Sequence, residues 1–193
     1  MTTVVLMGPP GAGKGTHSDL LAEKLGVPVI STGDIFRAQV AAATELGRQA
    51  QDYLNAGEYV PDEVTNAMVR ERLAADDCQP GFLLDGYPRT LDQAAVLDDL
   101  LTAQGRDLVA VVVLRVESEH LVRRLLRRAE IEHRSDDSEE VIRRRLQVYA
   151  DQTVPLISLY GGRELLHEVD GNGNIDEVRE QVLQVVGMLT PAE

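Results

Sequence analysis

The chain has 193 residues, 44% of them hydrophobic, and a formal net charge of −13 at pH 7. This length suffices for one well-packed domain, and the acidic charge argues against a protein that coats nucleic acid or binds an anionic membrane surface. The single cysteine, Cys78, excludes an internal disulfide and a zinc site made of clustered cysteines. No signal segment and no long apolar run are present, so a cytoplasmic protein is expected.

The first elements in chain order are a short apolar strand at residues 4–7 and a helix at residues 18–25. Between them lies the loop GPPGAGKGT at residues 8–16. Its glycines let backbone N–H groups converge on a phosphate, and the following helix N-terminus adds partial positive charge. Lys14 can reach the outer phosphates of a nucleotide. Gly15 stands where such loops usually carry Ser or Thr, with Thr16 one residue later. The alternative is a glycine-rich turn with an incidental lysine.

Strands and helices are predicted to alternate along the rest of the chain. We expect strands at residues 27–30, 82–84, 108–113 and 165–169. Helices are expected at residues 35–43, 45–56, 63–75 (capped by Asp62), 91–103, 118–128, 138–149 continuing through 154–160, and 176–189. Residues 130–137 are expected to form an exposed loop. The alternation predicts an α/β fold with a parallel sheet, with 108–113 as a central strand, and ligands at the carboxyl ends of the strands.

Asp85 ends an apolar strand, where a Walker B carboxylate would hold magnesium directly or through water. Arg89 follows four residues later, past a proline that restricts the path of the chain. Its planar guanidinium suits bidentate contact with phosphate. The alternatives are a solvated turn for Asp85 and a surface salt bridge for Arg89.

Eight arginines lie between Arg123 and Arg145, which in an acidic protein suggests a buried anionic ligand. Neighbouring residues on a helix point in different directions, so at most one or two from each cluster can face one site. The others are expected to be solvated or to pair with acids such as Glu139. The four histidines are interpreted as surface or structural residues.

These groups fit phosphoryl transfer, in which positioning and charge stabilisation do most of the catalysis. The sequence has no Cys–His pairing and no GxSxG elbow for covalent catalysis. It also offers no obvious isolated base, which weakly favours an acceptor that is already anionic, such as a phosphate.

Four ordered stretches carry a resemblance to a known family: GPPGAGKGT (8–16), STGD-x-x-R (31–37), LLDGYPRT-x-x-QA (83–94) and RSDDSEEVIRRRL (134–146). Together they resemble adenylate kinase over essentially the whole chain. The resemblance implies magnesium-dependent conversion of ATP and AMP to two ADP by a cytoplasmic monomer, with no nucleic-acid or membrane partner. It also implies a three-layer P-loop fold with a five-stranded parallel sheet. The core would be residues 1–30, 61–126 and 138–193, with an NMP-binding segment at 31–60 and a short lid at 127–137.

The match also implies roles for individual residues. ATP would contact Gly11, Ala12, Gly13, Lys14, Gly15, Thr16, Arg124, Arg128 and the backbone near Gly173. AMP would contact Thr32, Arg37, Glu58, Tyr59, Val60, Gly86, Tyr87, Pro88, Arg89, Gln93, Arg134 and Arg145. The catalytic set would be Lys14, Asp85, Arg89, Arg128, Arg134 and Arg145. Magnesium would have no direct protein ligand and would be ordered through water near Asp85 and Thr16.

Two further expectations concern the lid and the acceptor base. Relatives with a long lid often carry zinc-ligand positions there, but this lid has no cysteine, so no structural zinc is expected and closure would rely on Arg128 and Arg134. Thr32 and Gln93 favour AMP, since kinases for UMP or CMP commonly carry alanine and asparagine at these positions. A kinase for another nucleoside monophosphate and a non-catalytic nucleotide-binding switch remain the alternatives, and Lys14, Asp85 and Arg89 argue against the switch.

Overall fold

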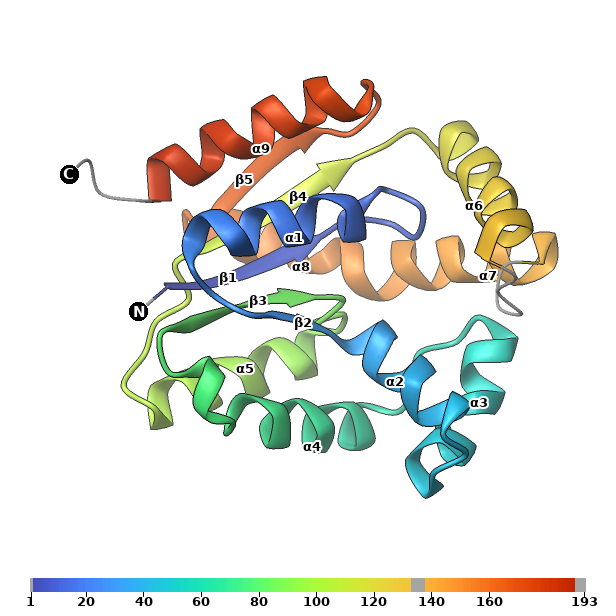
Figure 1. Cartoon of the computed structure of the whole chain (residues 1–193), viewed down its shortest axis with the longest axis horizontal. Helices are drawn as coiled ribbons and strands as arrows, with labels where there is room; N and C mark the ends of the chain where they lie inside the picture. Colours follow the sequence, from blue (N-terminus) through green and yellow to red (C-terminus); the bar gives the residue numbers. More distant parts are fainter. Residues whose placement is uncertain (1, 133–137, 190–193) are drawn as a thin grey trace.

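The computed structural model describes residues 2–132 and 138–189 and has a five-stranded sheet at its centre (Figure 1). The strands are β1 (Thr2–Met7), β2 (Val29–Ser31), β3 (Gly81–Asp85), β4 (Ala110–Arg115) and β5 (Leu166–Asp170). Their order in the sheet is β2-β3-β1-β4-β5, and all four pairings are parallel. This arrangement confirms the predicted α/β fold with a parallel sheet. The strand predicted at residues 108–113 is β4, which lies inside the sheet, but the central strand is β1.

Helices cover both faces of the sheet (Figure 1). One face carries α1 (Lys14–Leu25), α6 (Ser118–Glu132) and α9 (Ile175–Leu189), and the other carries α4 (Asp62–Leu73), α5 (Leu91–Ala103) and α8 (Val154–Gly162). At the carboxyl edge of the sheet lie α2 (Thr32–Ala41), α3 (Glu45–Ala56) and α7 (Glu139–Val148). The short 3-10 turn η1 (Asp76–Cys78) precedes β3, and the π-helical turn η2 (Tyr149–Thr153) joins α7 to α8.

The hydrophobic core is split in two by the sheet, as the alternation of side chains along a strand requires. In β1, Val4 and Leu6 face the core under α1 and α9, whereas Val5 and Met7 face the core under α4 and α5. All four side chains are at most 3% exposed. A central strand buried on both faces is rigid, and it holds the loop that follows Met7 in a fixed place.

Several predicted boundaries were wrong. Helix α1 begins at Lys14 and not at Ser18, because Gly13 adopts a left-handed φ of 92° and the chain turns helical directly after it. Helix α6 continues to Glu132, so residues 130–132 are helical and not loop. No Gly or Pro interrupts that stretch, and its residues are good helix formers. The remainder of the expected loop, residues 133–137, lies outside the described part of the chain.

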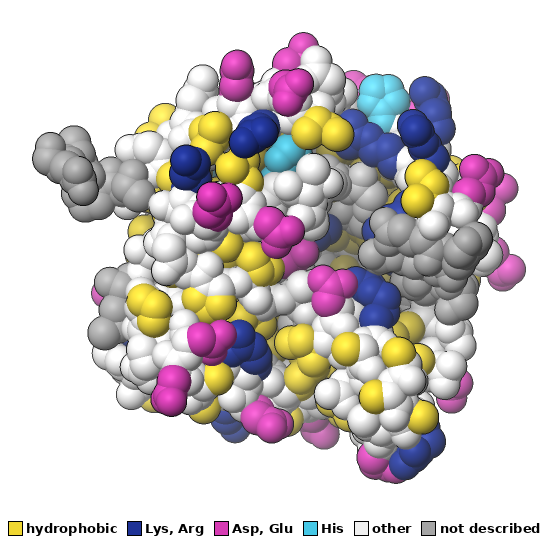
Figure 2. Space-filling view, viewed as in Figure 1, with side chains coloured by type: hydrophobic (Ala, Val, Ile, Leu, Met, Phe, Trp, Pro, Cys, Tyr) yellow, Lys and Arg dark blue, Asp and Glu magenta, His cyan; other side chains and the backbone are white. Residues whose placement is uncertain are grey.

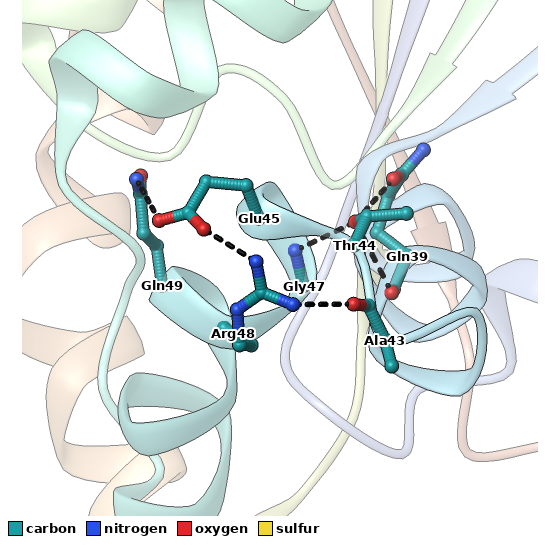
Figure 3. Close-up of polar contacts among 7 residues, drawn as sticks. All are labelled: Gln39, Ala43, Thr44, Glu45, Gly47, Arg48 and Gln49. Atoms are coloured by element: carbon teal, nitrogen blue, oxygen red, sulfur yellow. Dashed lines mark hydrogen bonds and ion pairs between the residues drawn. The ribbon is translucent and has the colours of Figure 1, made fainter.

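The corner between α2 and α3 is tightly packed (Figure 3). The Thr44 hydroxyl accepts a hydrogen bond from the Gly47 backbone N at 3.0 Å and donates to Oε1 of Gln39 at 2.6 Å. A Cβ on Gly47 would lie 2.1 Å from the Gln39 carbonyl oxygen, so only glycine allows the two helices to approach this closely. Arg48 donates to the carbonyl of Ala43 at 2.7 Å and closes the corner. Helices α2 and α3 therefore form one firmly joined hairpin.

Candidate active site

A cavity of about 900 Å³ opens at the carboxyl ends of the strands. Its walls come from the loop after β1, the start of α2, the end of β3, the inner faces of α6 and α7, and the turn after β5. Figure 2 shows dark-blue Lys and Arg side chains gathered over α6 and in the recess below it, whereas acidic side chains are spread over the rest of this face. The sheet thus collects residues distant in sequence around one basic cavity, as parallel α/β folds do.

The glycine loop forms the floor of this cavity. Gly11 and Gly13 have left-handed φ values of 82° and 92°. A Cβ on Gly11 would lie 2.8 Å from Cγ of Leu125, so glycine is needed for α6 to pack against the loop. Lys14 Nζ donates to the carbonyl oxygens of Gly8 at 2.8 Å and Pro9 at 3.2 Å, which holds its charge over the loop. The N-terminus of α1 begins at the same point, so a full charge and a helix terminus converge on one anion site.

Strong electrostatic coupling marks the cavity. Burial lowers the pKa of Lys14 from 10.5 to about 8; the carboxylate of Asp85 opposes this shift, and the nearby guanidinium groups of Arg89, Arg145 and Arg128 add to it. Burial also raises the pKa of Asp85, while Lys14 and Arg89 act in the opposite direction. Lys14 and the three guanidinium groups repel one another across the cavity, and an anionic ligand would relieve that repulsion.

Arg89 and Thr32 are fixed through the backbone of Gly86. Arg89 Nε and Thr32 Oγ1 both donate to the Gly86 carbonyl oxygen, at 2.7 Å and 2.8 Å. Gly86 has a φ of 78°, and a Cβ there would lie 2.9 Å from Arg89 Nη2 and 3.0 Å from Thr32 Oγ1. Glycine at this position therefore lets both side chains lie against the end of β3.

The structure distinguishes the members of the α6 arginine cluster. Arg124 and Arg128 line the cavity, and Arg124 Nη2 donates to the carbonyl of Gly171 at 3.0 Å. Arg123 and Arg127 point about a quarter turn away from them and are exposed. The helical periodicity predicted this division but not which residues would fall on which side.

On α7 only one of three arginines lines the cavity. Arg145 lies on its wall and packs against Gly57, whose Cβ would be 3.1 Å from Cγ of Arg145. Arg143 pairs with Glu139 at 2.7 Å, and Arg144 pairs with Glu58 at 2.5 Å. The remaining arginine of the expected site, Arg134, lies outside the described residues.

A smaller cavity adjoins the large one and shares Gly33 and Arg89 with it. It is mostly apolar, and its walls include Phe36, Leu54, Val60, Thr32 and Gln93. Gln93 contributes an amide side chain to this wall and is 1% exposed. The apolar walls and the amide group suit a flat heterocyclic base.

Other expected residues lie at or near these cavities. Thr16 and Gly173 line the large one, Pro88 lines a connecting recess, and Glu58 and Tyr59 line both that recess and the smaller cavity. Arg37 also lines the large cavity, where it pairs with Asp34 at 2.5 Å.

Tyr87 is placed differently. Its side chain is fully buried, and its hydroxyl donates to Oδ1 of Asn66 at 2.7 Å and also lies 3.2 Å from the carbonyl oxygen of Gln93. The ring belongs to the core between α4 and α5, so contact with a ligand in the cavity would fall to its backbone.

Sequence reasoning missed three positions near the site. His17 was expected to be a surface or structural residue, but it is buried on the wall of the large cavity, where burial and the charge of Arg124 lower its pKa. Asp62 was expected to cap α4. Pro61 occupies the cap position, and the Asp62 carboxylate bonds to residues of the β3–α5 region. Thr153 lies in the π-helical turn and bonds to the carbonyl of Arg89 at 2.8 Å. Of these three positions, only His17 could have been placed near the site from the sequence, because it lies one helical turn after Gly13 of the glycine loop.

The oxygen-containing side chains on the cavity wall are suited to a magnesium ion whose ligands are mainly phosphate oxygens and water. Asp85 supplies a carboxylate and Thr16 a hydroxyl, and Mg²⁺ prefers such hard ligands while keeping several waters. Within residues 2–132 and 138–189, no three His, Cys, Asp or Glu side chains are grouped so that they could hold a metal ion by themselves. In the same residues, no helix has the length and apolar character needed to cross a membrane.

Comparison with known proteins agrees with this geometry. The family model described as adenylate kinase matches residues 6–165. Curated relatives named adenylate kinase include one from Thermobifida fusca, 56% identical over 93% of this chain and 95% of its own length. Two more come from a Nocardioides species and from Kocuria rhizophila, each 53% identical, over 96% and 95% of this chain and 97% of their own lengths. The chain therefore belongs to the adenylate kinase family.

Proposed function

We propose that the chain transfers the terminal phosphoryl group of ATP to AMP, giving two ADP. Family membership over nearly the whole chain carries the reaction itself, ATP:AMP phosphoryl transfer. The observation that supports it in this chain is the basic cavity that joins the glycine loop to Arg89 and, beyond Arg89, to the apolar pocket at Gln93. Two nucleotides can then meet with their phosphates between Lys14 and Arg89.

The donor nucleotide would lie on the glycine loop. The backbone from Gly11 to Thr16 and the Lys14 ammonium group hold the phosphates of ATP. Arg124 and Arg128 lie along the same wall, and the turn containing Gly173 closes it near the adenine. Magnesium, when bound with ATP, neutralises phosphate charge, and Asp85 and Thr16 are the groups placed to order its water ligands.

The acceptor nucleotide would lie between α2, α3 and the end of β3. Its phosphate faces Arg37, Arg89 and Arg145, and its base enters the pocket formed by Thr32, Val60 and Gln93. Glu58 and Tyr59 lie along this path, as do the backbones of Gly86, Tyr87 and Pro88. A phosphate oxygen is already anionic at neutral pH, so no general base is needed.

Catalysis would come from charge cancellation and position. Negative charge accumulates on the transferring phosphoryl group in the transition state. Lys14, Arg89, Arg128 and Arg145 surround the point where the two phosphates meet, and Arg134 is proposed to join them. Fixed cations in a water-poor cavity stabilise that charge more than solvent does.

Closure of two segments would exclude water from this cavity. Residues 31–60 contain the α2–α3 hairpin. The segment that follows the hairpin contacts α7 through the Glu58–Arg144 pair and η2 through a 2.8 Å hydrogen bond between the hydroxyls of Tyr59 and Thr153. The lid at 127–137 would comprise the end of α6 and the residues that follow it. A monomeric state, a cytoplasmic location and the absence of structural zinc stay predictions.

Acceptor profiling tests the proposed function. In a coupled assay with ATP and magnesium, AMP should be phosphorylated with a higher kcat/KM than CMP, UMP or GMP. A preference for a pyrimidine acceptor would identify a UMP or CMP kinase instead. Nucleotide binding without ADP formation would identify a non-catalytic switch.

A further inference from the structure

The amide group of Gln93 is held on both sides. Its Oε1 accepts a hydrogen bond from the backbone N of Arg89 at 2.7 Å, and its Nε2 donates to Oδ1 of Asp62 at 2.6 Å. The side chain lies on the wall of the base pocket and is almost wholly buried. Asp62 therefore contacts the amide that the pocket offers to a base.

These two contacts allow a single orientation of the amide. A backbone N–H can only donate, and a carboxylate can only accept. If the amide turned by half a rotation, its NH₂ group would face the N–H of Arg89 and its oxygen would face the Asp62 carboxylate. Two opposed contacts at a buried site are unfavourable, because each leaves polar groups unsatisfied.

Asp62 is itself anchored by the helix that carries Gln93. Its Oδ2 accepts a hydrogen bond from Oγ1 of Thr90 at 2.7 Å, and the same hydroxyl caps α5 by accepting from the Gln93 backbone N at 3.1 Å. Asp62 is the first residue of α4, where Pro61 fixes the approach of the chain. Helices α4 and α5 thus hold the carboxylate in place on both of its oxygens.

The two hydrogen-bonding positions of the Gln93 amide that remain determine which base it can recognise. An amide side chain offers two acceptor and two donor positions, and one of each is already used. One acceptor on Oε1 and one donor on Nε2 remain. Adenine presents an amino donor next to the N1 acceptor. A 6-oxopurine, such as hypoxanthine or guanine, presents an oxygen acceptor next to an N1–H donor, which is the reverse pattern.

We propose that Asp62 is a positioning residue that sets acceptor specificity: by locking the Gln93 amide in one orientation, it makes the pocket accept adenine and reject 6-oxopurines. The inference rests on the proposed function, because it requires the acceptor base to lie beside Gln93. Without Asp62 the Gln93 amide could adopt either the orientation that matches adenine or the one that matches a 6-oxopurine. The backbone N–H of Arg89 would still favour the orientation that matches adenine.

The test compares AMP with IMP, whose hypoxanthine base differs from adenine at this edge. Asp62→Asn keeps the shape of the side chain but offers an NH₂ group as well as an oxygen. Glu63→Gln is the matched control, because it removes the same charge from the same first turn of α4 at an exposed position. The AMP:IMP ratio of kcat/KM should fall about tenfold or more in Asp62→Asn and stay unchanged in Glu63→Gln.

A merely structural role would give a different result. If Asp62→Asn lowered kcat/KM for AMP and IMP by the same factor, or changed neither, the inference would be overturned. Should Asp62→Asn fail to fold, NMR of the wild-type complex with AMP decides. Cross-peaks from the Gln93 side-chain amide protons to adenine H2 support the locked orientation, and their absence, with cross-peaks to the N6 amino protons instead, overturns it.

Calorimetric binding of AMP and IMP separates this inference from the proposed function. If the wild type binds AMP more tightly than IMP and this difference is smaller in Asp62→Asn, the positioning role of Asp62 is supported. If the wild type forms no ADP in the same experiments, the proposed phosphoryl transfer is rejected. Equal affinity of the wild type for AMP and IMP would overturn the positioning role, even if ADP is formed.

Discussion

The guanidinium carbon of Arg89 lies 4.8 Å from the centroid of the Tyr59 ring. Tyr59 follows α3, in the segment proposed to close over AMP, while Arg89 follows β3 in the core. The Tyr59 hydroxyl also bonds to Thr153, which donates in turn to the backbone of Arg89. The ring therefore supports the central arginine of the site, and the position of Arg89 depends on that of the α2–α3 hairpin.

Loss of Arg89 should remove most of the activity. We expect Arg89→Ala to lower kcat by roughly 10²-fold or more, because a transition-state charge partner disappears. Arg123→Ala is the matched control: Arg123 is exposed on α6, outside the cavity lining, and its loss should leave kcat nearly unchanged. Steady-state kinetics with saturating ATP and AMP measure both, and wild-type turnover in Arg89→Ala would remove Arg89 from the site.

Two substitutions at Tyr59 should separate its ring from its hydroxyl. Tyr59→Leu removes the cation–π contact, worth about 0.5–2 kcal/mol, so kcat/KM for AMP should fall by a few-fold to about thirtyfold. Tyr59→Phe keeps the ring and loses only the bond to Thr153, so its effect should be smaller. Equal effects of the two variants would show that the ring does not support Arg89.

Nucleotide binding should take up a proton at mildly alkaline pH. The pKa of Lys14 is lowered to about 8 in the free protein, and bound phosphate would raise it again. Above about pH 8, ATP binding should therefore be accompanied by proton uptake, and affinity should fall as pH rises. Calorimetry in buffers of different ionisation enthalpy measures this uptake. Lys14→Met should abolish it, and a binding enthalpy that is independent of the buffer in the wild type would contradict the assignment.

The lowered pKa of Lys14 affects the stability of the free protein with the opposite sign: ATP affinity should fall as pH rises, whereas stability should increase. Between about pH 8 and 10.5, Lys14 is mostly neutral when folded and still protonated when unfolded. The unfolded state then binds more protons, so the Lys14 contribution to the free energy of unfolding rises with pH across this window. The difference in unfolding free energy between wild type and Lys14→Met, measured at several pH values, should follow this sign.

Gly47→Ala should open the α2–α3 corner shown in Figure 3. The added methyl group would meet the backbone of Gln39 at 2.1 Å, so the helices must separate, at a cost of about 1–3 kcal/mol in the free energy of unfolding. Because the hairpin would carry the AMP pocket, KM should rise more for AMP than for ATP. Gly187→Ala on α9 is the control, since nothing among the described residues lies within 4 Å of its added methyl group and stability should not fall. An unchanged free energy of unfolding in Gly47→Ala would contradict the close packing of α2 against α3.

Patterns with a strong local cause were predictable from the sequence. Apolar runs predicted the parallel sheet, and the glycine loop with Lys14 predicted the edge of the sheet at which the cavity lies. Helix periodicity indicated that the arginine clusters must divide. It did not show that Arg128 and Arg145 line the cavity, because that depends on how α6 and α7 pack against the core.

Contacts between distant elements were not predictable in the same way. Asp62 resembles a helix cap in sequence, and its bond to Gln93, 31 positions away, exists only because α4 and α5 are neighbours. Tyr59 and Thr153, 94 positions apart, meet because the π-helical turn directs Thr153 toward the hairpin. Such tertiary contacts leave no periodic trace in the chain.

The central claim is that two nucleotides meet head-on above the glycine loop. A crystal structure with a bisubstrate analogue, in which two adenosines are joined by a phosphate chain, tests it most directly. One adenosine should lie near Gly173 with its phosphates on residues 11–16, and the other should lie beside Thr32, Arg89 and Gln93. A second adenosine bound anywhere else would contradict the account.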